Sequence, residues 1–305
     1  MDVVIIGATG LIGSALILKL YRQHEITAVG RDVRVVRQQF PFCKSLALQD
    51  LGLEDLAACD VVINLAGENI GQGRWNEARR AKIINSRISV TQQVVTLCRK
   101  LGHEAPRVFN ASAIGVYGLQ ETSVSVSPQL TEESPLPSPP TDFLSEVAID
   151  WENVLKFLDP EKVVQLRFAV VLAGNGGALP KLALPFYFGC GGKIASGQQM
   201  VSWVALKDVV AAIVFLLERP LLWGAFNIVA PEGVHQYQFA GVLANVLKRP
   251  NLMWTPGFLL QLVYGQMAKE LILKGQYVVP KRLLDVGFQF QYGDLARALQ
   301  DIYSE

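Results

Sequence analysis

The chain has 305 residues, half of them hydrophobic, and a formal net charge of +1. This length and hydrophobic content suffice for one large core, or for a core with a smaller lobe. The near-neutral charge without a basic run argues against nucleic acid as a partner, and no stretch reaches the length of a membrane span.

The N-terminus predicts a buried strand, a glycine turn and a helix start in immediate succession. Residues 3–6 are apolar without polar alternation, which is typical of the centre of a parallel sheet. Glycines follow in a GxxGxxG spacing, which permits a tight turn, approach of a pyrophosphate and close helix packing. The alternative is an ordinary strand-to-helix turn. We predict a dinucleotide site formed by Gly7, Thr9, Gly10, Leu11, Ile12 and Gly13.

The second predicted strand, residues 26–29, ends at Gly30-Arg31-Asp32. A carboxylate at this place is typical of an NAD site, whereas arginine suits the 2′-phosphate of NADP. Arg34 and Arg37 follow Arg31, so we predict NADP, held through Arg31, with NAD as the less favoured cofactor. The alternative is that Asp32 binds the ribose and the arginines form a solvated helix face.

Apolar strands continue to alternate with helical patterns. Residues 61–67, 107–112 and 163–167 predict strands, and residues 88–98 form a helical stripe. This alternation predicts an α/β fold, a Rossmann doubly wound parallel sheet with ligands at the carboxyl ends of its strands. The residues predicted to line the cofactor at these ends are Leu65, Ala66, Gly67, Ala111 and Arg167.

Several loops are predicted to form the substrate cleft. Residues 118–141, rich in Ser, Thr and Pro, predict a surface loop near the cleft. Residues 174–201 contain two glycine-rich stretches and an amide-rich turn that precedes Trp203. Such a surface can hydrogen-bond a polar substrate while the indole provides an apolar wall, so we predict substrate contacts for Gln199 and Trp203. The alternative is that these glycines serve turns only.

The C-terminal part predicts a smaller, mainly helical lobe. Asp208 precedes an apolar helical run and is expected to be its N-cap. Helical spacing recurs over residues 237–247, 258–267 and 295–302, punctuated by prolines. We therefore divide the chain into a dinucleotide-binding domain, residues 1–230, and a C-terminal lobe, residues 231–305, for which a dimer contact is one candidate role.

The cysteines are scattered without CxxC pairing or nearby histidines. Neither a zinc site nor a disulfide framework is therefore expected, and no metal is predicted. Reduced, mostly buried thiols and a start without a basic leader predict a cytoplasmic location.

Three segments resemble the extended short-chain dehydrogenase/reductases, the class of nucleotide-sugar epimerases and dehydratases: residues 7–13, 64–67 and 112–118. A narrower set resembles the atypical "epimerase family proteins", also labelled sugar-nucleotide epimerase-like or cell-division-inhibitor-like, whose C-terminal segment is a domain of unknown function. This second resemblance covers essentially the whole chain. It lies in residues 64–70, 74–75, 86–87, 176–177, 184–186, 191–192, 196–199, 203 and 280–283.

The resemblance implies a catalytic Tyr-x-x-x-Lys pair that this chain lacks. In the wider family the tyrosine moves the proton, the lysine lowers its pKa and holds the nicotinamide ribose, and a serine orients the substrate oxygen. The best-matching places hold Phe143 and Val147. Because loss of a positioned acid or base costs about 10²–10⁴ in rate, the ordinary redox mechanism does not transfer directly.

Ser112 matches the family serine and is predicted to orient the substrate. Tyr117 follows on the turn that leaves the same strand and is predicted to move the proton, with a buried, hydrogen-bonded core tyrosine as the alternative. Lys181, Lys193 and Glu146 are weaker candidates, because such side chains are usually solvated.

Two functions remain open. The first is an NADP-dependent epimerase or oxidoreductase that acts on a sugar nucleotide or a similar polar small molecule. The second is a catalytically weak, dinucleotide-binding regulatory protein linked to cell division. The intact glycine turn supports both functions, and the absent tyrosine and lysine favour the second.

Overall fold

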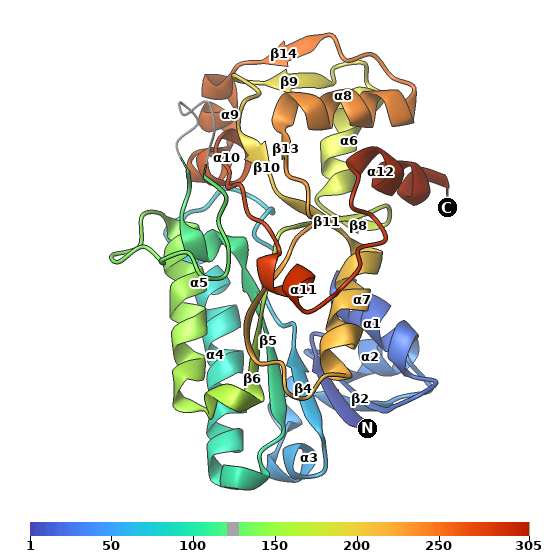
Figure 1. Ribbon diagram of the computed structural model, residues 1–305, viewed down its shortest axis with the longest axis vertical. Helices are drawn as coiled ribbons and strands as arrows, with labels where there is room; N and C mark the ends of the chain where they lie inside the picture. The colour runs from blue at the N-terminus through green and yellow to red at the C-terminus, as the bar shows by residue number, and fades with distance from the viewer. Residues whose placement is uncertain (121–127, 305) are drawn as a thin grey trace.

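A seven-stranded parallel sheet organises the computed structural model, which describes residues 1–120 and 128–304. The strand order is β12-β6-β5-β4-β1-β2-β3, which confirms the predicted Rossmann fold (Figure 1). Part of the loop predicted over residues 118–141 lies outside the described residues. The strands are β1 (Asp2–Ile6), β2 (Glu25–Gly30), β3 (Lys44–Ala47), β4 (Val61–Asn64), β5 (Arg107–Ala113), β6 (Val163–Phe168) and β12 (Gly224–Ile228).

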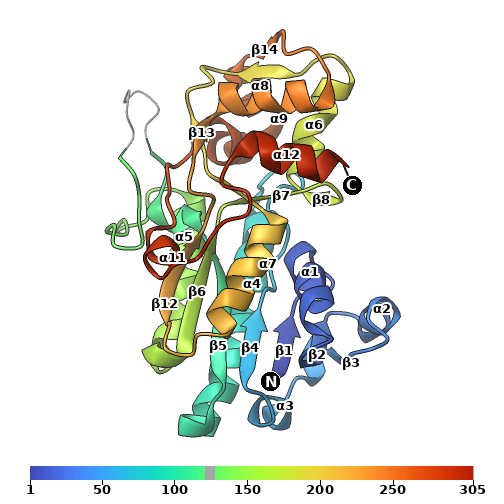
Figure 2. The ribbon, with the colours of Figure 1, turned by 45° about the vertical axis from the view of Figure 1, so that its right-hand side comes forward.

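Both faces of the sheet are buried, which explains why its strands are apolar without alternation. Val3 and Ile5 of β1 pack into one core cluster, and Val4 and Ile6 pack into another on the opposite face. Helices α1 (Leu11–Leu20) and α7 (Leu206–Leu217) cover the first face, and α4 (Glu77–Leu101) with α5 (Phe143–Val154) covers the second (Figures 1 and 2). The short helices α2 (Val33–Gln39) and α3 (Leu53–Ala57) connect the strands at the β3 edge.

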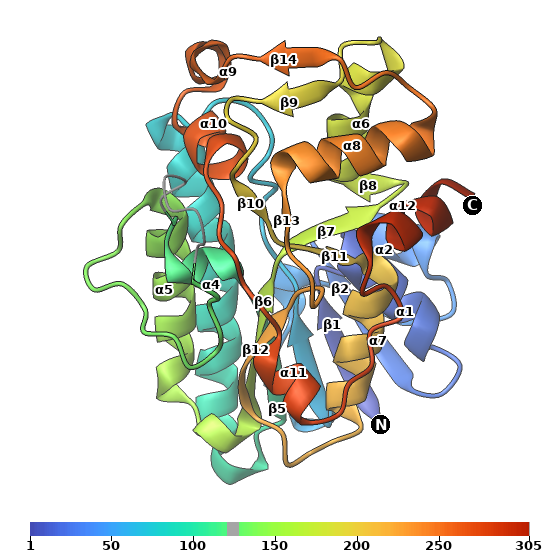
Figure 3. The ribbon, with the colours of Figure 1, turned by 45° about the horizontal axis from the view of Figure 1, so that its top comes forward.

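A second, smaller lobe lies beyond the carboxyl ends of the sheet (Figures 1 and 3). Its own core includes Phe186, Trp203, Phe239, Leu243 and Leu299. The lobe contains β7 (Val170–Ala173), β8 (Gly176–Gly177), α6 (Leu179–Tyr187), β9 (Gly192–Ile194), β10 (Met200–Val201), β11 (Trp203–Ala205), β13 (Val234–His235), α8 (Gln236–Leu247), β14 (Met253–Thr255), α9 (Gly257–Tyr264), α10 (Gln266–Ala268) and α12 (Leu295–Ser304).

The chain passes between sheet and lobe more than once. The lobe draws on residues 170–205 as well as on the C-terminal segment. Between α10 and α12, helix α11 (Lys281–Asp285) returns to the sheet, where the Arg282 guanidinium donates to the carbonyl of Ala225 on β12 at 2.6 Å. The helices predicted in the C-terminal part are present, and the division at residue 230 stays a prediction.

Asp208 is not the N-cap that we expected. Helix α7 begins earlier, at Leu206, with Ala205 as its N-cap. The Asp208 carboxylate instead accepts the backbone N–H groups of Gln291 and Tyr292, each at 2.9 Å. The sequence showed an acid before an apolar run, but not the distant segment whose amides that acid would bind. Within residues 1–120 and 128–304, no helix combines the length and the apolar character needed to cross a membrane.

Candidate functional site

The glycine turn joins the carboxyl ends of three strands. Gly7 has a φ of +85°, and a Cβ there would lie 2.9 Å from the backbone of Leu65, which follows β4. A Cβ on Gly13 would lie 2.3 Å from the carbonyl oxygen of Gly7. The N–H groups of Gly7 and Ala8 donate to the carbonyl of Val29 on β2. Only glycine fits at positions 7 and 13, so the turn holds α1 tightly against the sheet.

The N-terminus of α1 is left open. Gly10 is its N-cap, no side chain caps it, and its first turn carries no acidic residue. Thr9 and Gly10 are exposed, and Leu11 and Ile12 are half-buried. The first amides of a helix lack partners within the helix and sit at the positive end of its dipole. The site therefore suits a phosphate group.

A hairpin of the lobe lies over this turn. Cβ atoms on Gly176 and Gly177, in the β7–β8 hairpin, would each lie 3.1 Å from the Leu11 side chain. A Cβ on Gly174 would likewise lie 3.3 Å from the Ile302 side chain of α12. The glycine-rich stretch at residues 174–177 is thus brought to the dinucleotide turn, as the predicted cleft requires. The stretch at residues 189–192 instead leads into β9, in the outer part of the lobe.

Arg31 and Asp32, the two candidates for contact with the cofactor ribose, have different surroundings at the end of β2. Both carboxylate oxygens of Asp32 are engaged by Arg34, through its backbone N–H at 2.9 Å and its guanidinium at 3.1 and 2.9 Å. These bonds lower the pKa of Asp32. The side chain of Arg31 is 86% exposed, and its guanidinium lies 3.5 Å from the Glu68 carboxylate. The Arg34 side chain is equally exposed, at 87%, but its guanidinium is bound to Asp32, so Arg31 is the less tightly paired cation at this strand end.

Glu68 forms an ionic cluster that our sequence analysis missed. Its carboxylate lies 2.8 Å from Arg79 and 3.7 Å from Lys82, both on α4. The hydrogen bond from Arg79 lowers the pKa of Glu68, and burial lowers the pKa of Arg87, below the same loop, to about 10. The signal available in the sequence was the pair Arg79 and Lys82, which lie three residues apart and so share one face of α4. The cluster fixes the loop after β4 next to Arg31.

A buried amide network supports the predicted cofactor residues Leu65, Ala66 and Gly67. Asn64, the last residue of β4, donates to Thr91 Oγ1 at 3.0 Å and to Asn110 Oδ1 at 2.7 Å, and its own Oδ1 accepts the Ala66 N–H at 3.2 Å. Asn110 lies on β5, directly before the predicted cofactor residue Ala111. The ends of β4 and β5 are thus rigidly joined below the cleft.

The predicted residues Ser112, Tyr117 and Arg167 meet in a second buried network. Ser112 Oγ donates to Glu152 Oε1 at 2.7 Å, and the Arg167 guanidinium donates to both Glu152 oxygens at 2.8 Å. Arg167 also donates to the Tyr117 hydroxyl at 2.9 Å, and that hydroxyl donates to Asn227 Oδ1 at 2.8 Å. Burial alone would lower the pKa of Arg167, but the hydrogen bonds that Arg167 donates to the Glu152 carboxylate outweigh burial and raise that pKa.

This network defines what the predicted residues can do. Arg167 is 5% exposed and is committed to Glu152 and Tyr117. The Tyr117 hydroxyl already donates and accepts, and burial raises its pKa. The Ser112 proton is directed at Glu152, which leaves the oxygen lone pairs of Ser112 as acceptors. Proton transfer by Tyr117 requires its bond to Asn227 to open, and cofactor contact by Arg167 requires a similar rearrangement. These roles stay predictions.

Phe143 and Val147, in the first turns of α5, are buried in an apolar cluster. The Phe143 ring lies 5.0 Å from the Trp75 ring and 4.4 Å from the Arg80 guanidinium, and Val147 belongs to the same apolar cluster. The backbone N–H groups of Phe143 and Leu144 donate to the buried carboxylate of Glu270, from the C-terminal part, at 3.4 and 3.0 Å. The lobe therefore docks onto the N-terminus of α5.

The predicted substrate residues Gln199 and Trp203 are both buried. Trp203 is 0% exposed, and its Nε1 lacks a hydrogen-bond partner within the described residues. Gln199 donates from Nε2 to the carbonyls of Ile194 and Ile272, at 3.3 and 3.0 Å, and its Oε1 is likewise unpartnered there. Contact with a substrate would require this part of the lobe to open, so their role stays a prediction.

The weaker candidates lie apart from the buried network. Lys181 donates to the carbonyl of Gly71 at 2.8 Å, Glu146 lies 3.9 Å from Arg80, and Lys193 is exposed on β9. Within the described residues, no group of His, Cys, Asp or Glu side chains is arranged to hold a metal ion.

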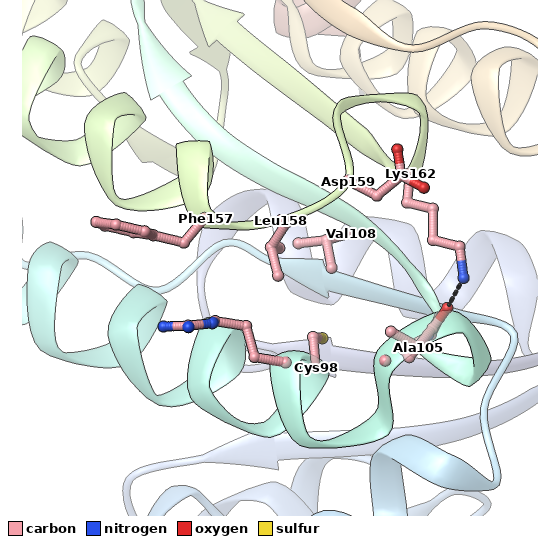
Figure 4. Close-up of a pocket in the computed structure, with 10 residues that line it drawn as sticks. Cys98, Ala105, Val108, Phe157, Leu158, Asp159 and Lys162 are labelled. Atoms are coloured by element: carbon pink, nitrogen blue, oxygen red, sulfur yellow. Dashed lines mark hydrogen bonds between the residues drawn. The ribbon is translucent and has the colours of Figure 1, made fainter.

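A pocket of about 240 Å³ opens at the opposite end of the sheet (Figure 4). Cys98, Val108, Phe157 and Lys162 are among the residues that line it. Lys162 donates there to the carbonyls of His103 and Ala105. Because ligands of parallel sheets bind at the carboxyl ends of the strands, this pocket is not the candidate site.

Comparison with known proteins places the chain in a family. Residues 3–151 match the NAD dependent epimerase/dehydratase family, and residues 255–302 match a domain of unknown function, DUF1731. Epimerase family protein SH2119 of Staphylococcus haemolyticus is 36% identical over 302 residues, with 98% of this chain and 97% of the relative covered. This chain is an epimerase family protein. The resemblance seen in the sequence is thereby confirmed.

Other relatives of this epimerase family protein agree. YfhF of Bacillus subtilis is 34% identical, with 100% of this chain and 99% of the relative covered. The crystal structure of human epimerase family protein SDR39U1 with NADPH has a TM-score of 0.86 and 31% identity, with both chains fully covered. UDP-glucuronic acid 4-epimerase from Bacillus cereus, solved with NAD, has a TM-score of 0.74 at 16% identity, which shows a shared fold.

Proposed function

We propose that this epimerase family protein binds NADP(H) at the carboxyl ends of β1, β2 and β4, and acts on a sugar nucleotide or similar polar small molecule. The observation that carries the proposal is the uncapped N-terminus of α1, placed in a turn that requires glycine at positions 7 and 13 and next to the exposed Arg31. The NADPH in the human relative supports it. The four cysteines are free thiols, which supports a cytoplasmic location.

Each part of the site has a role in this proposal. The pyrophosphate lies over Gly10 to Ile12 and is held by the amides of Leu11 and Ile12, because the Gly10 N–H already donates to the Gly7 carbonyl at 3.0 Å. Arg31 holds the 2′-phosphate. Residues 65–67 and Ala111 line the rest of the dinucleotide, and the β7–β8 hairpin covers Leu11 and excludes water. A nicotinamide dinucleotide, when bound, supplies the chemistry of hydride transfer.

Ser112 orients the substrate in this proposal. Because Glu152 fixes the direction of the Ser112 proton, a lone pair of Ser112 Oγ can accept a hydrogen bond from a substrate hydroxyl. Tyr117 or a water molecule moves the proton. A screen of nucleotide sugars by thermal shift, with and without NADPH, tests the substrate class; a class-specific shift that needs NADPH is expected, and the absence of any shift would count against an enzyme.

A regulatory protein with weak turnover, linked to cell division, is the second candidate. It is favoured by Phe143 and Val147, which occupy the acid/base positions and are sealed against Trp75 in an apolar cluster. In that case the protein binds NADPH but oxidises it negligibly with every nucleotide sugar offered. Robust turnover of any one of them would exclude this candidate.

Arg31→Ala is expected to abolish most of the preference for NADPH over NADH. A charge-assisted contact contributes about 1.5 kcal/mol at such an exposed site, roughly tenfold in affinity. Calorimetric titration of both cofactors measures the ratio. Arg22→Ala is the matched control, because Arg22 is an exposed arginine just after the C-terminal end of α1, away from the glycine turn, and its ratio is expected to stay near that of the unmodified protein. Equal affinity of the unmodified protein for both cofactors would refute the assignment.

Ser112→Ala is expected to lower turnover of a substrate found in the screen by about 10²-fold or more, with a small change in stability. The Arg167 bonds to Glu152 remain in that variant, so the buried carboxylate keeps its partner. Steady-state kinetics with NADPH and thermal melting give the two readouts. Turnover unaffected by both Ser112→Ala and Tyr117→Phe would place the active site elsewhere.

A further inference from the structure

The outer end of the lobe carries an apolar surface that nothing in the described structure covers. No charged residue lies between Arg249 and Lys269. The side chains that make up this β14–α9 surface are strongly exposed: Leu252 87%, Leu262 73%, Phe258 68%, Trp254 60%, Val263 55%, Met253 49% and Leu259 44%.

The secondary structure beneath this surface is also incomplete. Helix α9 has no fully buried residue, although a helix that is apolar on most sides is normally buried. Within the described residues, β14 pairs only with β9, so its other edge is open. Both elements lie at the end of the molecule farthest from the seven-stranded sheet (Figures 1 and 3). An open apolar edge beside an uncovered apolar helix is a surface that proteins normally protect.

We propose that the β14–α9 surface binds the same surface of a second copy of this chain, forming a two-fold symmetric dimer. Weighted by their exposed fractions, its side chains present on the order of 800 Å². This exceeds the roughly 300–600 Å² of the largest apolar patch on an ordinary monomer, and it matches the ~800 Å² that each partner contributes to a stable interface.

Charge decides between a second copy and other partners. A two-fold interface brings every residue near its own counterpart, so a charged surface would place like charges together. The seven side chains of the β14–α9 surface carry no charge and avoid this cost, and the exposed cation next to them, Lys193, lies on β9 and not on the open edge of β14. A lipid surface fits less well, because helices that lie on membranes pair their apolar face with Lys and Arg, and α9 contains neither.

The test measures the oligomeric state of the full chain by light scattering and sedimentation equilibrium between about 1 and 100 µM. The unmodified protein is expected to be a dimer. Phe258→Glu combined with Leu262→Glu is expected to weaken dimerisation at least hundredfold, because the interface would gather four carboxylates. The matched control is Leu18→Glu combined with Leu221→Glu, which adds the same charge at exposed leucines outside the surface and is expected to stay dimeric.

Circular dichroism and thermal melting show whether each variant is folded. If the glutamate variant does not fold, Leu262→Gln is used instead, with a tenfold rise in the dimer dissociation constant expected. A monomeric unmodified protein at 100 µM overturns the proposal. So does a folded surface variant that dimerises as tightly as the control. Binding of the unmodified monomer to neutral phosphatidylcholine vesicles would assign the surface to lipid and likewise overturn it.

Discussion

Arg167→Met is expected to destabilise the folded protein by about 3–5 kcal/mol, the cost of leaving a buried charge without its partner. Glu152 is 6% exposed and would keep only its bond from Ser112. The Tyr117 hydroxyl would also lose its donor. Urea unfolding, followed by circular dichroism and tryptophan fluorescence together, measures the change and shows whether both probes report one transition.

A second variant separates the ion pair from simple loss of packing. Glu152→Leu combined with Arg167→Met removes both charges and is expected to recover a large part of the lost stability, since an apolar pair can replace a buried ion pair. Arg31→Met, at an exposed site, should leave the unfolding curve nearly unchanged. If the double variant is at least as unstable as Arg167→Met, the unpaired carboxylate is not the cause of the loss.

Gly10→Val is expected to lower NADPH affinity by at least about a hundredfold, while the protein remains folded. Gly10 has an ordinary φ of −76°, and its added Cβ would lie 3.1 Å from the Gly7 carbonyl oxygen, which would have to move by a few tenths of an ångström. The isopropyl group would then project where a phosphate must approach the amides of α1. Loss of two or more charge-assisted hydrogen bonds accounts for an effect of this size.

The control for this variant is another glycine at a helix start. Gly52 is the N-cap of α3, and a Cβ there meets only ordinary contacts at 3.9 Å. Gly52→Val should leave the calorimetric affinity for NADPH unchanged. A folded Gly10→Val protein with the affinity of the unmodified chain would place the dinucleotide away from α1.

The sequence was sufficient to predict the sheet and the glycine turn, because both depend on local patterns. Buried parallel strands are recognisable as short apolar runs, and the glycine spacing marks a turn that requires glycine at positions 7 and 13. The C-terminal helices were predictable for the same reason, since their apolar spacing is visible within each segment.

The partners of the polar site residues were not predictable, because they are distant in sequence. Tyr117 bonds Asn227, and Ser112 bonds Glu152 on another element. An arginine within an apolar strand implies a buried counter-ion, but the sequence does not say which carboxylate supplies it. Trp203 was expected beside a substrate because amides precede it. Its burial depends on segments as distant as α8 and α12, which share its core cluster.

Because the chain passes repeatedly between sheet and lobe, we expect that the C-terminal segment cannot fold separately from the rest of the protein. The segment matched to the domain of unknown function, residues 255–302, has no core of its own, because Leu295 and Leu299 share theirs with Phe186 and Trp203. Its α11 is at the same time anchored to β12 through Arg282. This segment is therefore not an independent folding unit. If it were grafted onto another Rossmann protein, Leu295 and Leu299 would lack the side chains of residues 170–205 against which they pack here.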